Sequence, residues 1–275
     1  MATILERKIL QKLDEWERRD GALPETVEHY RLLLRIQIEV GSKIAESLPS
    51  PPEQTAVSQL ALGRPLLGFD DLQLDAAAFR QVLTRVTDIM VSDSDAARIS
   101  PELEGLSSIA LMTLVKRWYE ADHVHPEAGD ANTKLLAPVI REAAKPFLCR
   151  YREAWLPLVD HELWRRPSCP ICGGSPDFGC LNSAGTRSLL CSRCDADWLF
   201  QRLQCPWCET NDPRKLAYFG DEEGTYRLYV CENCHRYLKV IDSRQAKEEV
   251  LLPLERVLTV DLDRQARSLG YSAAS

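Results

Sequence analysis

Eight cysteines are the residues of this sequence best suited to chemistry, because they form four Cys-x-x-Cys pairs in one segment. The pairs are CPIC (169–172), CSRC (191–194), CPWC (205–208) and CENC (231–234). A Cys-x-x-Cys turn aims two sulfurs at one point, and two such turns complete a tetrahedral set of four thiolate ligands. The pattern therefore indicates metal binding by sulfur.

The cysteine segment is an internal repeat with an offset of 36 residues, from Cys169 to Cys205. Each copy begins with Cys-Pro-x-Cys, turns at a Gly-Thr between two expected strands, continues into a second Cys-x-x-Cys and ends on a third strand. If each copy is one module, its own two pairs share a metal ion. We therefore predict two four-cysteine metal sites, the first made by Cys169, Cys172, Cys191 and Cys194, and the second by Cys205, Cys208, Cys231 and Cys234.

Other arrangements of the same thiols remain open. In an interleaved arrangement the first and third pairs would share one metal, which the repeat disfavours. A redox dithiol at Cys205 and Cys208 needs an exposed thiolate of lowered pKa, usually at a helix N-terminus, whereas this motif leads towards the expected strand RKLAYF. Disulfides need an oxidising compartment, to which nothing else in the sequence points.

A closed four-sulfur site is structural, because it leaves no coordination position for substrate or water. The sequence also has no G-x-S-x-G, no phosphate-binding glycine loop and no H-E-x-x-H. We therefore predict that the protein is not an enzyme. Intrinsic affinity of the ligands favours zinc over ferrous iron. However, Cys-x-x-Cys turns, called knuckles from here on, resemble those of rubredoxin when they begin with Cys-Pro, and rubredoxin holds iron. Spacing does not separate the two metals.

The remaining cysteines and histidines give weaker signals. Cys149 and Cys180 lie outside the four pairs, and we expect both to be small core residues. His123 and His125 have no acidic or thiol partner at a ligand spacing, so we expect a solvated loop there.

Residues 1–165 have the pattern of an all-α domain. Apolar residues recur at steps of three and four, as in Ile9, Leu13 and Trp16, and again between Phe79 and Met90. Ser100-Pro101 is expected to start a helix. Pro138, Pro146 and Pro157 are expected to break the stretch 134–166 into shorter pieces.

The pattern changes at residue 166, where short alternating strands replace helices. TYRLYV (225–230) and YLKVID (237–242) are typical of half-buried strands, and the tail after 243 returns to helix, with Pro253 splitting it or marking a start. We therefore predict an α+β fold: a helical domain (1–165), two tandem small β-rich rubredoxin-like or zinc-ribbon-like modules (166–203 and 204–243) and a C-terminal helical tail (244–275).

Charge and hydropathy limit the classes of partner. The net charge is −7, and residues 166–245 contain ten basic and ten acidic residues, so a phosphate-tracking surface is not expected. No apolar run is long enough to span a membrane, and the charged N-terminal stretch does not have the form of an export signal. We therefore expect a cytoplasmic protein with a protein partner and no nucleic acid. A nucleic-acid-binding zinc ribbon protein and an iron redox carrier remain the alternatives.

The order of the motifs resembles that of the FdhE family, the formate dehydrogenase accessory proteins. The resemblance is carried by CPIC, CSRC, CPWC and CENC after a helical half, and by ALGRPLLGF, CSRCDADWLFQRLQCPWC and YVCENCHRYLKVID. It extends over essentially the whole chain and is most specific in the cysteine segment.

The resemblance implies a cytoplasmic maturation factor with rubredoxin-like metal modules, which binds the catalytic subunit of respiratory formate dehydrogenase before export. It also favours iron as the metal in both sites. In one respect the sequence departs from rubredoxin: Gly173 follows the first knuckle, but Asp195, Glu209 and His235 follow the others. A fully rubredoxin-like turn is therefore not expected at every knuckle.

Overall fold

The computed structural model describes residues 2–44, 48, 51–91, 103, 105–121 and 131–273, without the side chains of 131–135. The expected helix start at Ser100-Pro101 and the histidines His123 and His125 lie outside the described residues. The chain packs as two compact units, one of residues 1–48 and 67–151 and the other of residues 49–66 and 152–275. The four-part division at residues 165, 203 and 243 stays a prediction.

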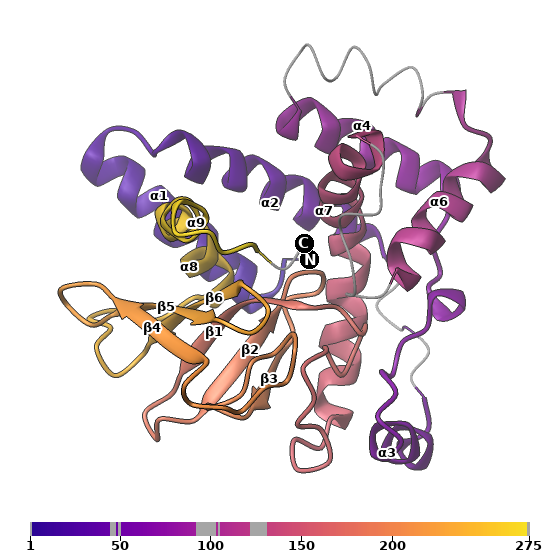
Figure 1. Ribbon diagram of the computed structural model, residues 1–275. Coiled ribbons are helices and arrows are strands. Elements are labelled where there is room, and N and C mark those ends of the chain that lie inside the picture. The colour runs from indigo at the N-terminus through magenta and orange to yellow at the C-terminus, as the bar shows by residue number, and fades with distance from the viewer. Residues whose placement is uncertain are drawn as a thin grey trace. The chain divides into compact units, whose positions relative to one another are not determined.

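The first unit is built from helices: α1 (Ile4–Asp20), α2 (Glu25–Lys43), α4 (Ala76–Met90), α6 (Ser108–Glu120) and the part of α7 (Ala131–Trp155) up to Tyr151 (Figure 1). Its helix starts follow the local sequence, since Thr3 and Glu6 form a capping box and Asp75 accepts a hydrogen bond from the backbone of Ala78. The predicted apolar stripe from Phe79 to Met90 is buried as far as Val86, whereas Met90 at its end is 36% exposed.

The expectation that prolines break the segment after residue 134 is wrong for two of the three. Helix α7 runs through Pro138 and Pro146 without interruption, and only Pro157 coincides with a change, in the 3₁₀ turn η3 (Leu156–Leu158). An internal proline costs about 3 kcal/mol. The helix buries a long apolar face that offsets this cost, and its buried residues include Ile140, Ala143, Phe147 and Leu148.

The second unit contains α3 (Glu53–Ala61), a six-stranded sheet and two C-terminal helices. The strands are β1 (Pro176–Leu181), β2 (Arg187–Cys191), β3 (Asp197–Phe200), β4 (Leu216–Gly220), β5 (Tyr226–Cys231) and β6 (Arg236–Asp242). Their order across the sheet is β3-β2-β1-β6-β5-β4, so the two cysteine repeats form one sheet (Figure 1).

The two repeats join through a parallel pair, β1 with β6, in which Phe178 lies opposite Lys239. The other pairs among these six strands are antiparallel. It follows that β1 and β4, the equivalent first strands of the two repeats, run in the same direction. The repeats are therefore related by a step along the sheet, and both sets of knuckles lie at the same ends of the strands.

The predicted helical tail is two short helices, α8 (Leu252–Leu258) and α9 (Val260–Ser268). Pro253 lies in the first turn of α8 and marks its start, where its missing N–H costs nothing. Side chains of this segment pack on the sheet: Leu252 joins the cluster of Phe178 and Ile241, and Ala266 joins that of Leu228. Cys180 is half-buried at the edge of the first of these clusters.

Candidate metal centres

All four knuckles have the same turn, although only one of them has glycine after its second cysteine. The residue in that position has a positive φ in every case, 69° at Gly173, 55° at Asp195 and Glu209, and 52° at His235. Asp and His adopt this left-handed conformation more readily than most residues, whereas Glu does so at a cost. The rubredoxin-like turn is thus not limited to the first knuckle, because three non-glycine residues accept the strained conformation.

Backbone hydrogen bonds close the first and third knuckles in the same way. In the first knuckle, the N–H of Cys169 donates to the carbonyl of Gly174 at 2.9 Å, and that of Gly173 donates to the carbonyl of Cys169 at 3.0 Å. The third knuckle repeats both bonds, from Cys205 to Thr210 at 2.9 Å and from Glu209 to Cys205 at 3.1 Å. These bonds fix the backbone so that both sulfurs of a pair face one point.

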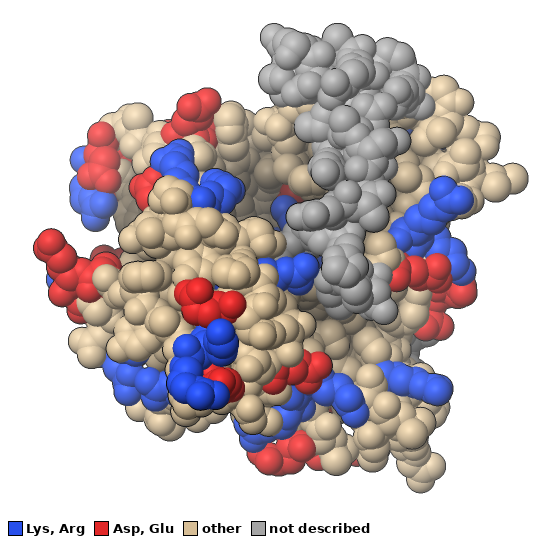
Figure 2. Space-filling view, in the orientation of Figure 1, with Lys and Arg blue, Asp and Glu red and all other residues tan. Residues whose placement is uncertain are grey.

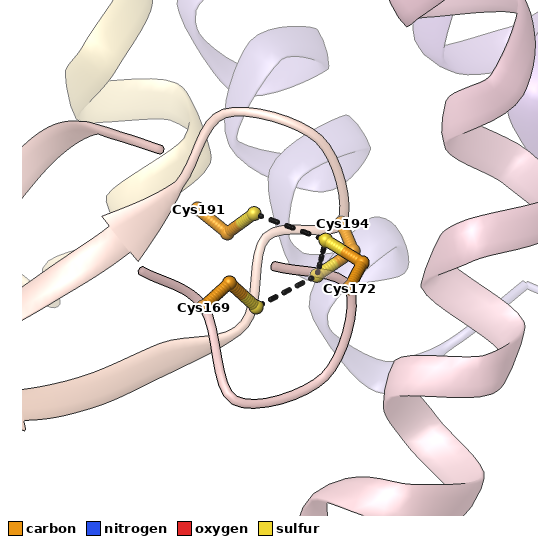
Figure 3. A group of neighbouring side chains, drawn as sticks. All are labelled: Cys169, Cys172, Cys191 and Cys194. Carbon is orange, nitrogen blue, oxygen red and sulfur yellow. Dashed lines mark hydrogen bonds between the residues drawn. The ribbon is translucent and has the colours of Figure 1, made fainter. Parts of the chain in front are cut away.

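The first group of sulfurs comes from the knuckle before β1 and the knuckle between β2 and β3 (Figure 3). The sulfur–sulfur distances are 3.6 Å for Cys169–Cys194, 3.5 Å for Cys172–Cys191 and 3.6 Å for Cys172–Cys194. The backbone of Gly174 packs directly against this group, since a Cβ at that position would lie only 2.9 Å from the sulfur of Cys191.

The second group is formed by the equivalent elements of the second repeat. The distances are 3.6 Å both for Cys205–Cys234 and for Cys208–Cys231. In each group all four sulfurs lie within 4.8 Å of one another. The cysteines therefore meet within repeats, as the repeat predicts, and the pairs Cys191–Cys194 and Cys205–Cys208 belong to different groups.

These distances fit a tetrahedral metal–sulfur cage. With a metal–sulfur bond of about 2.3 Å, the edge of a regular tetrahedron is about 3.8 Å. A disulfide would bring two sulfurs to about 2.05 Å, and none of the ten cysteines is so bonded. The chemistry of four thiolates suits zinc or iron equally, so the geometry does not choose between them. That the eight cysteines bind metal stays a prediction.

The two groups differ in exposure. All four cysteines of the first group are buried, whereas Cys208 and Cys234 of the second are half-buried. The second group is therefore the one that solvent and partners reach more readily.

Crowding perturbs the thiols themselves. Burial raises the pKa of Cys169 and Cys194, while hydrogen bonds from Cys169 and its other neighbours lower the pKa of Cys172. In the second group burial opposes ionisation of Cys208, but a hydrogen bond with Asn233 and others bring its pKa to about 7. In the first group Cys172 loses its proton readily, whereas Cys169 and Cys194 resist ionisation. A cation bound at the centre would stabilise all four cysteines as thiolates.

Arginines from distant segments hold the second knuckle of the first group. Arg256 on α8 donates to the carbonyl of Cys191 at 2.9 Å and lies 2.9 Å from carboxylate oxygens of Asp177 and Asp195. Arg152 donates to the carbonyl of Cys194 at 3.3 Å. The backbone N–H of Arg193 donates to the sulfur of Cys191 at 3.3 Å. Sequence reasoning missed Arg152 and Arg256, because neither lies near a cysteine of this group in the chain.

The aromatic residues of this half divide between core and surface. Trp198 is fully buried and donates its indole N–H to the carbonyl of Arg166 at 2.8 Å, and Tyr237 is buried as well. Tyr218 and Phe219 on the edge strand β4 are 54% and 42% exposed, which leaves them free to contact a partner. Acidic and basic side chains are interspersed on the face shown in Figure 2.

No family model matches the chain. The sequence is similar to curated FdhE proteins: 35% identical to an FdhE homologue of Aquifex aeolicus, over 41% of this chain and 41% of that protein. It is 29% identical to an FdhE homologue of Haemophilus ducreyi and 28% identical to FdhE of Escherichia coli, in both cases over 40% of this chain and 37% of the relative. The chain thus matches about two fifths of the length of these relatives.

The whole fold is similar to a solved structure, the FdhE protein of Pseudomonas aeruginosa. The TM-score is 0.61, with 98% of this chain and 91% of that chain covered and 20% of residues identical. The fold is therefore that of a solved FdhE protein, and about two fifths of the chain is similar in sequence to curated FdhE proteins.

Proposed function

We propose that this protein is a cytoplasmic accessory factor for formate dehydrogenase, which binds the immature catalytic subunit through its two four-cysteine modules. The observation that carries the proposal is the pair of closed four-sulfur groups, side by side in one sheet, in a chain similar to FdhE proteins. Each group would hold one metal ion. The cytoplasmic location rests on the family resemblance.

The geometry suits an adaptor better than a catalyst. A four-thiolate site has no open coordination position, so its metal stabilises a fold and does not activate water. Both groups lie at the same ends of the strands, and the exposed Tyr218 and Phe219 lie on the open edge strand of the second repeat. Together they offer a preformed surface for a protein. Among the described residues, no helix combines the length and apolarity that a bilayer span requires.

Iron is the proposed metal, on the family resemblance, and zinc is the alternative. Metal analysis together with the visible spectrum separates the two. Two iron atoms per chain with thiolate-to-ferric absorption support iron. A colourless protein with two zinc ions contradicts it and leaves the adaptor role intact.

Co-purification tests the proposed partner. The full-length chain is expressed with the formate dehydrogenase catalytic subunit, and capture is compared for the Cys169→Ser, Cys205→Ser and Cys180→Ser variants. Capture is expected for the wild-type chain and for Cys180→Ser, which lies outside both groups, and loss for the two ligand variants. Normal formate dehydrogenase activity in a strain without this protein contradicts the proposal. So does salt-dependent binding of the chain to DNA or RNA with no capture of the subunit.

A further inference from the structure

A cavity of about 190 Å³ lies in the second unit beside the second cysteine group. Both repeats contribute to it, since Arg187 and Arg202 come from the first and Trp207, Tyr218, Tyr229 and Arg236 from the second. No Asp or Glu is among the described residues that line it. The cavity is therefore bounded by three guanidinium groups and three aromatic rings.

Arg187 is the most unusual of these residues, because its charge is buried without a carboxylate. The residue is 2% exposed on β2, and in the described part of the chain it forms no ion pair. One terminal nitrogen donates to the backbone carbonyls of Gln201 and Gln204. The guanidinium lies over the rings of Phe200, at 5.3 Å, and Tyr229, at 5.9 Å. A buried cation held only by carbonyls and rings lacks the counter-ion that such groups ordinarily have.

Two buried donors of the cavity wall also have no acceptor among the described residues. They are the Nε–H of Arg187 and the indole Nε1–H of Trp207. Buried polar groups in native proteins are almost always hydrogen-bonded, so two orphaned donors in the lining of one cavity indicate an acceptor that belongs there.

Arg187 has a second possible role, as the counter-charge of the second cysteine group. Cys205 and Cys231 also line the cavity, and a divalent metal with four thiolates carries a net charge of about −2. However, the orphaned Nε–H of Arg187 reaches no sulfur within hydrogen-bonding distance. The three arginines also exceed that negative charge. Compensation of the metal group therefore does not satisfy the donors of the cavity.

We propose that this cavity binds a carboxylate group. A carboxylate has two oxygens that accept from the guanidinium and the indole N–H together, and it supplies the missing negative charge. The aromatic walls suit the carbon atoms that carry the group. The volume is below the range of about 300–1,000 Å³ typical of sites for drug-sized ligands and cofactors, which argues against a nucleotide. The group comes either from a free small acid or from an acidic residue of a polypeptide. This site goes beyond the proposed accessory role and does not depend on it.

Calorimetric titration of the full-length, metal-loaded protein tests the site. One arm uses sodium acetate, with sodium chloride at equal ionic strength as the blank. The other uses two blocked peptides that differ only in a central Glu or Gln. Saturable one-to-one binding of acetate supports the site and a free acid as its source. Binding of the Glu peptide at least tenfold tighter than the Gln peptide supports the site and a polypeptide source. No saturable binding in either arm, or equal binding of the two peptides without acetate binding, contradicts the proposal.

Variants locate the binding. Trp207→Phe keeps an aromatic ring but removes the orphaned N–H, and we expect it to weaken carboxylate binding about tenfold. Arg187→Lys keeps the charge but removes the planar donor set, and should weaken binding at least as much. Arg214→Gln is the matched control, since Arg214 is 87% exposed and pairs with Asp212 outside the cavity. If the Arg187→Lys variant no longer holds metal, its binding result cannot be interpreted, and the Trp207→Phe variant alone tests the site. Unchanged binding in Trp207→Phe contradicts the assignment of this cavity.

Discussion

The guanidinium of Arg256 lies 2.9 Å from the carboxylate of Asp195, the left-handed residue that directly follows Cys194. The same side chain donates to the carbonyl of Cys191, which lies 65 residues earlier in the chain. One arginine of the tail thus fixes both ends of a knuckle that is distant in sequence.

Removing this arginine should weaken the first metal group and leave the second unchanged. Groups that orient metal ligands typically contribute about 10–100-fold in affinity, so Arg256→Gln is expected to lower affinity at the first group by about that factor. Competition with a chromophoric chelator measures this. Arg264→Gln is the control, because Arg264 is exposed and pairs with Asp261 on the same helix. Equal loss from both groups would instead indicate general unfolding.

A chelator should empty the second group before the first. Every cysteine of the first group is buried, whereas Cys208 and Cys234 are half-buried and open to attack. Native mass spectrometry after timed exposure to chelator is expected to show a one-metal species that accumulates before the metal-free chain. The metal of the second group should be lost in a fast phase and that of the first group in a slow phase. Cys205→Ser, which disables the second group, should lack the fast phase, and Cys169→Ser, which disables the first, should lack the slow phase. A single phase in the wild-type chain would contradict the prediction.

Glycine at position 209 should stabilise the protein. Glu209 is exposed and has a φ of 55°, a conformation that costs a side-chain-bearing residue about 1–2 kcal/mol and glycine little. After allowance for the greater freedom of glycine in the unfolded chain, Glu209→Gly is expected to gain about 0.5–1 kcal/mol. Thermal unfolding at fixed metal loading measures the gain. Glu222→Gly, at an exposed position without a positive φ, should give none.

Asp242 should make the free energy of unfolding fall at low pH. Its carboxylate is fully buried and lies 2.6 Å from nitrogens of both Arg227 and Arg244. The hydrogen bond from Arg244, more than the charge of Arg227, holds the pKa of Asp242 below its usual value. The stabilisation is therefore complete above the unfolded pKa of about 3.9 and is lost as the pH falls through the lower folded pKa.

Asp242→Asn is accordingly expected to cost about 3 kcal/mol near neutral pH, because the half-buried Arg227 loses its carboxylate partner. The difference in unfolding free energy between wild type and variant should stay constant down to about pH 4 and shrink below it. Asp212→Asn provides the comparison, since Asp212 pairs with the exposed Arg214. A difference that grows on acidification would contradict this account.

The local patterns of the sequence were sufficient for much of the fold. Alternation of apolar residues predicted β5 and β6 to within a residue, and the repeat predicted which cysteines meet. Both depend on interactions between residues close in the chain or on copies of one module. The left-handed turns at Asp195, Glu209 and His235 were not predicted, since glycine is the usual residue at such a turn and only the first knuckle has one.

The features that the sequence did not predict depend on contacts between residues far apart in the chain. Nothing in the residues of β1 indicates that β6 is its neighbour, because an apolar strand pairs equally well with any exposed edge of suitable register. The prolines of α7 have a strong local effect that burial outweighs. Arg256 and Arg187 look like ordinary surface residues in the sequence, and only the folded sheet shows that they are not.

The parallel pair of β1 and β6 imposes an order on folding during synthesis. The first repeat contains all four of its own cysteines, and its hairpins are local, so it can form as soon as Phe200, the last residue of β3, is available. At a synthesis rate of about 5–20 residues per second, the 36-residue offset puts the second repeat about 2–7 s later. During that interval the inner edge of β1 has no neighbour, because its partner strand β6 is the last of the sheet to be made. If the first group binds its metal ion during this interval, β6 pairs with an already folded first repeat; if it does not, β1 presents an unpaired strand edge that can aggregate.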